Sequence, residues 1–145
     1  MSTARTEMTD MADTTIRRID PPELGPPPSY TQVVEATGRH IVFISGQAAF
    51  DKSGALVGAG ECEAQAEQCF RNLAHALVAV GCTAANLTKL TVFLVDMNDL
   101  PKYRNARDRF FSAAGALKPP AVTLVEVSRL YAPGAMIEIE AIAVR

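Results

Sequence analysis

The sequence has 145 residues, of which 48% are hydrophobic and 21% charged, and its formal net charge is −2. This length and composition predict one globular domain with a single core. Without a run of five Lys or Arg residues the chain lacks the basic footprint that phosphates require, so nucleic acid is not an expected partner. Apolar runs stay below the length of a membrane span, so no membrane partner is expected either.

The cysteines and histidines predict neither a disulfide framework nor a metal site. Cys62, Cys69 and Cys82 form no C-x-x-C pair, and their odd number is typical of free thiols in a reducing cytosol. His40 and His75 fall on different predicted elements, so no metal is expected. The first fifteen residues, MSTARTEMTDMADTT, are polar and acidic, unlike a signal-peptide core or an arginine-rich transit peptide, which favours a cytoplasmic protein.

Residues 1–18 show no periodicity and are predicted to form a flexible tail, followed by one domain over 19–145. The proline-rich segment 21–28 is expected to be extended, because proline lacks an amide donor and restricts the residue before it. Segments 32–36 and 39–49 are rich in Val, Ile and Phe and are predicted strands. Gly46, inside the second, indicates a bulge or a close approach by a ligand or another backbone.

Two segments have helical periodicity. Residues 61–80 carry an apolar stripe that ends before Gly81, and a second helix is expected between Asp99 and Gly115. The side chains expected to be buried are Ala66, Phe70, Leu73, Leu77 and Val80 in the first helix and Tyr103, Ala106, Phe110 and Ala114 in the second.

Further strands are predicted at 87–95, 121–127 and 136–144, which gives the order ββαβαββ. Right-handed βαβ crossovers place both helices on one face of a mixed sheet, so the fold class is α+β.

The last strand has two different faces. Ile137, Ile139, Ala141 and Ala143 suit the helix-packed face, whereas the opposite face mixes Glu138 and Glu140 with Met136, Ile142 and Val144. A half-apolar sheet face is explained by burial against another subunit. The alternative is that both glutamates are merely solvated strand residues.

Five short strings occur in an order and at separations that resemble the RidA (YjgF/YER057c/UK114) family. They are YTQ at 30–32, ISGQ at 44–47, TVFLVDM at 91–97, FF at 110–111 and IEIEAIA at 137–143. The resemblance implies a chorismate-mutase-like fold and a homotrimer with sites between subunits. It also implies hydrolysis of reactive enamines and imines, such as 2-aminoacrylate, without a metal or organic cofactor.

Carried over by position, the family's site tyrosine resembles Tyr30, its site serine resembles Ser45, and its water-positioning glutamate resembles Glu138. The family's site asparagine falls at Arg104 if the two phenylalanines set the register, or at Asn105 if the register slips by one residue.

One departure from the family pattern affects the expected substrate. Where active deaminases of the family read Pro-Ala-Arg-Ser/Thr, this chain has Val122 followed by Thr123. An arginine grips a carboxylate through a planar two-pronged hydrogen bond, and a charge-assisted bond contributes about 1.5–3 kcal/mol. The resemblance therefore implies substrate-binding positions at Val122 and Thr123 but weak or no activity on 2-aminoacrylate.

The remaining chemistry is still that of a C=N hydrolase. Glu138 can orient or deprotonate a water, Tyr30 can donate a hydrogen bond, and the backbone near Ser45 and Gly46 can receive a polar substituent. Arg104 and Arg107 lie one turn apart and either supply a cation or are solvated arginines of the helix surface. The alternatives are a non-catalytic trimer that binds a small molecule, or a tautomerase or cyclising role.

Overall fold

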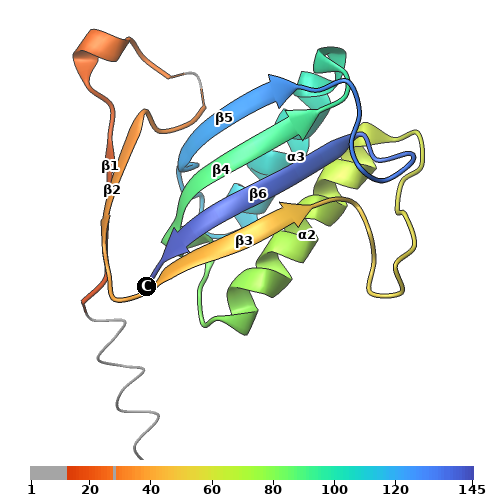
Figure 1. The fold of residues 1–145 in the computed structure, drawn as a ribbon. Helices are drawn as coiled ribbons and strands as arrows, with labels where there is room; N and C mark the ends of the chain where they lie inside the picture. Colours follow the sequence, from red (N-terminus) through yellow and green to blue (C-terminus); the bar gives the residue numbers. More distant parts are fainter. Residues whose placement is uncertain (1–12, 28) are drawn as a thin grey trace, which may run out of the picture.

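The structure is a computed structural model and describes residues 13–27 and 29–145 (Figure 1). Its strands and helices follow one another in the order β1 Thr15–Ile19, β2 Val33–Thr37, β3 Ile41–Gln47, α2 Cys62–Ala79, β4 Leu87–Leu94, α3 Leu100–Ala113, β5 Ala121–Glu126 and β6 Ile137–Val144. Three short 3₁₀ turns, η1 Pro22–Leu24, η2 Ala84–Asn86 and η3 Met97–Asp99, lie between them.

The main sheet has four strands in the order β3-β6-β4-β5. β4 and β5 are parallel, whereas β6 is antiparallel to both of its neighbours, β3 and β4. Both α-helices cover the same face of this sheet (Figure 1). The predicted α+β class, with a mixed sheet and two helices on one face, is therefore confirmed.

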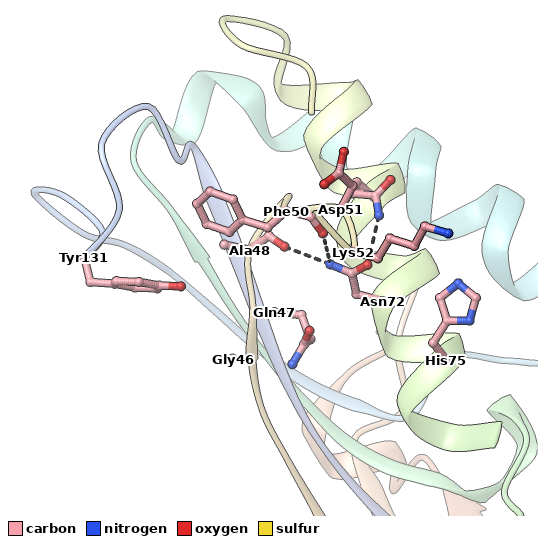
Figure 2. Close-up of a pocket in the computed structure, with 10 residues that line it drawn as sticks. Gly46, Gln47, Ala48, Phe50, Asp51, Lys52, Asn72, His75 and Tyr131 are labelled. Carbon is pink, nitrogen blue, oxygen red and sulfur yellow. Dashed lines mark hydrogen bonds between the residues drawn. The ribbon is translucent and has the colours of Figure 1, made fainter. Parts of the chain in front are cut away.

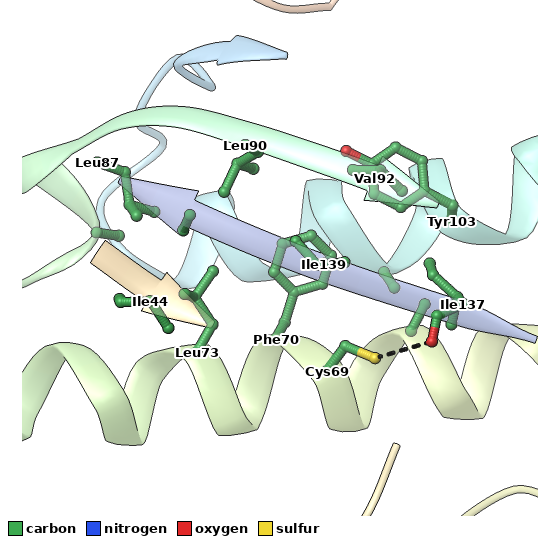
Figure 3. Close-up of a cluster of buried hydrophobic side chains, with 14 of the residues drawn as sticks. Ile44, Cys69, Phe70, Leu73, Leu87, Leu90, Val92, Tyr103, Ile137 and Ile139 are labelled. Atoms are coloured by element: carbon green, nitrogen blue, oxygen red, sulfur yellow. Dashed lines mark hydrogen bonds between the residues drawn. The ribbon is translucent and has the colours of Figure 1, made fainter. Parts of the chain in front are cut away.

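The core lies between this face and the helices. Figure 3 shows Phe70 of α2 beneath Ile139 of β6, and Leu73, further along α2, beneath Ile44 of β3. Val92 of β4 pairs with Ile139. Phe70 also stacks on Phe110 of α3, with ring centroids 4.9 Å apart. The predicted stripe of α2 is thus the surface that packs on the sheet.

The buried side of α3 differs in part from the prediction. Tyr103 and Ala106 are buried as expected, but Arg107 and Phe111 are buried too and Ala114 is exposed. The apolar periodicity of this helix does not include Arg107, because an isolated arginine usually points to solvent. Within the described residues, no helix combines the length and apolarity needed to cross a membrane.

The N-terminal region corrects two predictions. All of β1, Thr15–Ile19, except its last residue lies inside the segment 1–18 predicted to be a flexible tail, and residues 1–12 lie outside the described residues. β1 pairs with β2 in a separate two-stranded antiparallel sheet, so β2 is not a strand of the main sheet. Pairing with β2 provides hydrogen bonds for N–H and C=O groups of β1. Local periodicity does not reveal such a long-range pairing.

The sheet face turned away from the helices, called the open face below, carries exposed apolar side chains. Phe43 is 75% exposed and Ile41 is 65% exposed. On β6 the predicted alternation is confirmed: Ile137, Ile139, Ala141 and Ala143 are buried. Glu138 and Glu140 lie on the open face, as expected from the period of two.

Candidate functional site

Glu138 and Gly46 lie against each other across β6 and β3. The pairing of these strands shifts between Ile44 and Gln47, so the Ser45–Gly46 step is irregular, as the glycine had indicated. A Cβ built on Gly46 would overlap the carboxylate of Glu138 and lie 2.8 Å from its carboxyl carbon. Only a glycine therefore admits the Glu138 side chain in this position.

The surroundings of Glu138 favour its protonated form. Partial burial raises the pKa of this carboxyl above its ordinary value of 4.5, and the negative charge of Glu140 adds to the effect. A carboxylate with a raised pKa is a better proton acceptor, which suits a general base. Ser45 lies next to Gly46 and is exposed on the open face.

A broad pocket of about 790 Å³ begins at Gly46 and Gln47 (Figure 2). Asn72 of α2 forms part of its wall and donates hydrogen bonds to the carbonyl oxygens of Ala48 and Phe50, at 3.1 and 2.8 Å. These bonds hold the chain after β3 on α2. Tyr131, from the loop before β6, lies on the opposite side of the pocket (Figure 2).

A second, smaller cavity of about 240 Å³ lies between α3 and β5 and is called the α3–β5 cavity below. Thr31 fixes the segment before β2 at this place: its amide donates to Pro120 O at 3.1 Å and its hydroxyl to Pro119 O at 2.7 Å. The neighbouring Tyr30 is thereby held near the N-terminal end of β5. The described lining residues are Ser29, Tyr30, Leu100, Tyr103, Arg104, Arg107, Val122 and Leu124.

The two register alternatives on α3 point in different directions. Arg104 lines the α3–β5 cavity, whereas Asn105 lies within 3.5 Å of Glu63 on α2. Arg109, one turn further on, donates to the same Glu63 at 2.7 Å. The geometry therefore brings Arg104, and not Asn105, together with Tyr30.

Val122 and Thr123 also separate, because neighbouring residues of a strand face opposite sides. Val122 lines the α3–β5 cavity, whereas Thr123 is exposed and accepts a hydrogen bond from Lys89 Nζ at 2.6 Å.

The candidate residues therefore form two groups within one chain. One group is Tyr30, Arg104 and Val122 at the α3–β5 cavity, and the other is Gly46 and Glu138, with Ser45 beside them, at the irregular end of β3. The sequence analysis did not identify Tyr103 as a cavity residue. It left open whether Arg107 supplies a cation or is solvated, although the one-turn spacing of Arg104 and Arg107 indicated that both could line one site. Among the described residues, no group of three or more His, Cys, Asp and Glu side chains is arranged to hold a metal ion.

Most of this α+β domain matches the model of a known protein family. The family model described as Endoribonuclease L-PSP matches residues 22–145. The chain belongs to this family, the RidA/YjgF family that the sequence motifs resemble.

Three similar proteins illustrate the range of the family. The chain is 39% identical over 126 residues to a 2-iminobutanoate/2-iminopropanoate deaminase of Mus musculus, covering 86% of this chain and 85% of the mouse protein. Its fold is similar to that of YyfB from Yersinia pestis, a Rid family protein of unknown function, with a TM-score of 0.81, 28% identity and coverage of 90% and 98%. E. coli TdcF with bound serine gives a TM-score of 0.68, 32% identity and coverage of 83% and 91%.

Proposed function

We propose that this protein hydrolyses the C=N bond of a small imine, or of the imine formed from an enamine, and releases a carbonyl compound and ammonia. The observation that carries the proposal is Glu138, a carboxylate with a raised pKa that only a glycine at position 46 accommodates. Two further facts support it: a relative named as an imine deaminase and a related structure with a bound amino acid.

The reaction needs one water and no cofactor. The imine nitrogen first takes up a proton from solvent, and Glu138 accepts a proton from the water while the water oxygen bonds to the imine carbon. The tetrahedral carbinolamine then collapses: Glu138 returns its proton to the nitrogen, the carbon–nitrogen bond breaks and ammonia leaves, and the hydroxyl releases its proton to solvent as the oxygen becomes a carbonyl. Tyr30 donates a hydrogen bond to the ligand, and the backbone at Ser45 and Gly46 receives its polar substituent.

The complete site forms between subunits of a homotrimer. Support comes from the two separated groups of candidate residues and from the open face, where Phe43 and Ile41 are largely exposed in the single chain. Exposed apolar side chains of this size mark interaction surfaces. A neighbouring copy that covers the open face can bring its Tyr30 and Arg104 toward Glu138.

Val122 points to a substrate other than 2-aminoacrylate, or to weak activity on it, because an apolar side chain stands where a carboxylate-gripping arginine is expected. The same observation favours the second candidate function, a trimer that binds a small molecule without catalysis. Ribonuclease activity, which the description of the family suggests, is disfavoured, because Glu138 and Glu140 on the open face would repel phosphates.

The test is the disappearance of an imine or enamine, generated in place by an amino-acid oxidase or a dehydratase, against its spontaneous hydrolysis. Glu138→Gln should lose about 10²–10⁴-fold in kcat, the range of a general base. Val122→Arg should improve hydrolysis of 2-aminoacrylate, and Glu138→Ala should abolish that gain. If Glu138→Gln keeps full activity, Glu138 is not the general base and the mechanism is refuted. If no imine is hydrolysed by the wild type, the non-catalytic function replaces this proposal.

A further inference from the structure

Gln65 is a fully buried amide in the first turn of α2. It is 0% exposed, and its helix neighbours Ala66 and Cys69 belong to the apolar core. Burying an amide is costly unless new hydrogen bonds replace those to water, and an apolar side chain would fill the space without that cost. The reason for a glutamine at this position therefore lies in the groups that it binds.

Gln65 uses its whole amide on backbone groups outside α2. Nε2 donates to Gly58 O at 3.1 Å and to Gly134 O at 3.0 Å, and Oε1 accepts from the amide of Met136 at 2.8 Å. A primary amide has two N–H groups, so both donors are used. Met136 O in turn accepts from Val95 N at 3.1 Å, directly after β4. The residue before β6 is thereby held between α2 and the end of β4.

Asn72 makes the corresponding contact with the other strand of the site. It lies two helical turns after Gln65, so both side chains leave the same face of α2. Its Nδ2 donates to Ala48 O and Phe50 O (Figure 2). Ala48 is the second residue after Gly46, so Asn72 fixes the chain immediately beyond the irregular end of β3.

On β6 the path from the held residue to the base is equally short. Met136 is the second residue before Glu138, which is about 7 Å of extended chain. Ile139, next to Glu138, pairs with Gln47 of β3. An extended strand has no slack over this length, so a shift of Met136 would move Glu138 relative to Gly46.

We propose that Gln65 and Asn72 are positioning residues that seat the carboxylate of Glu138 against Gly46, Gln65 through the start of β6 and Asn72 through the chain after β3. Each acts through the backbone of a strand and not by touching the reacting atoms. The assignment rests on the proposed function, because it concerns the base of that hydrolysis. A misplacement of about 1 Å at a reacting centre can cost about a hundredfold in rate, so a modest loosening is sufficient.

Alanine variants of both residues should lower turnover without weakening substrate binding. Gln65→Ala releases the amide of Met136, and Asn72→Ala releases the carbonyl groups of Ala48 and Phe50. Each should lower kcat for imine hydrolysis by about 10–100-fold and leave KM within about threefold of the wild type, because the base moves while the ligand contacts stay. Asn72 is only partly buried, so its variant carries the test alone if Gln65→Ala does not fold.

Asn86→Ala is the matched control, because Asn86 holds the opposite end of the same strand. Asn86 lies in η2, is 8% exposed, donates to Val144 O at 3.0 Å and accepts from Thr83 N at 2.9 Å. Its loss should lower the unfolding temperature as Gln65→Ala does, since both remove a buried amide from its partners. Val144 lies about 20 Å along the strand from Glu138, so kcat should stay within about twofold of the wild type.

A second readout does not depend on turnover. The carboxyl carbon of Glu138 is followed by NMR in a pH titration, and its signal is identified by its loss in Glu138→Gln. Partial burial holds the pKa of this carboxyl above 4.5 in the wild type. The midpoint should fall in Gln65→Ala and Asn72→Ala, because the displaced carboxylate is better hydrated, and should stay unchanged in Asn86→Ala.

The positioning role is overturned if Asn86→Ala lowers kcat as much as Gln65→Ala does, or if both α2 variants keep the kcat and the titration midpoint of the wild type. Either result would refute the positioning role alone, provided that Glu138→Gln still abolishes turnover. A wild type that hydrolyses no imine would refute the proposed function instead. The positioning role would then be supported by a lower Glu138 midpoint in the α2 variants and overturned by an unchanged one.

Discussion

Gly46→Ala should displace Glu138 and thereby cost both activity and stability. The new methyl group would lie 2.8 Å from the carboxyl carbon of Glu138 and 3.0 Å from its Cγ, which is closer than such contacts occur. Gly46 is not among the glycines with a left-handed backbone, so alanine brings no backbone strain of its own. The penalty should therefore arise almost entirely from the glutamate.

The expected magnitude follows from how the overlap is relieved. An added methylene in a packed site costs about 1–3 kcal/mol. The carboxylate is the end of a flexible side chain, so it can rotate away at an off-rotamer cost of about 0.5–1.5 kcal/mol. We expect Gly46→Ala to lower the free energy of unfolding by about 1 kcal/mol, because this relief is the cheaper route. The rate of imine hydrolysis should fall about 10²–10⁴-fold, as the base leaves its position.

A double-mutant cycle isolates this contact. In a Glu138→Ala background the alanine at 46 meets no carboxylate, so its cost should fall within about 0.5 kcal/mol of zero. Urea unfolding gives the free energy of unfolding of the wild type, the two single variants and the double variant. All four are measured at one protein concentration, because association of subunits would contribute to the apparent stability. Ser45→Ala, at the exposed neighbouring position, is the control for stability. An equal cost of Gly46→Ala with and without Glu138 would refute the reasoning.

Two further predictions concern protonation and assembly. Because the base must be ionised, kcat/KM should rise with pH through a midpoint above 4.5, and Glu140→Gln should lower that midpoint; an unchanged midpoint would contradict the charge effect. A raised pKa means that the folded state holds the proton more tightly, so stability is lost as pH rises through the folded pKa, and Glu138→Gln should not lower the free energy of unfolding at pH 7. Light scattering should give three times the chain mass of 15.5 kDa, and Phe43→Glu should reduce it, whereas a wild-type mass near 15.5 kDa would rule out the trimer.

The parts of the fold that sequence periodicity predicts are those whose neighbours lie close along the chain. The stripe from Ala66 to Leu77 is buried because spacings of three and four residues point one way along α2. The alternation of Ile137 and Ile139 with Glu138 separates the two faces of β6 in the same way. Both patterns are local, so they can be recognised in the sequence without knowledge of the tertiary structure.

The features that were missed depend on partners distant in the sequence. β1, with two arginines in five residues, is a strand because β2 pairs with it. Arg107 is buried in part because Ser29, 78 residues away in the sequence, accepts a hydrogen bond from it. The overlap that restricts position 46 to glycine likewise involves a carboxylate on another strand. No periodicity encodes such contacts, so the site could be assembled only in part.

The burial of the three cysteines affects how the protein tolerates the compounds it is proposed to handle. Burial raises the pKa of Cys62 to about 11 and that of Cys69 to about 12, and the pKa of Cys82 is raised as well. At neutral pH, Cys62 is then ionised in only about one molecule in ten thousand. Because the thiolate is the nucleophile, such thiols react slowly with carbon electrophiles. The carbon of an imine is an electrophile, so under the proposed function the buried thiols would react only slowly with the substrate.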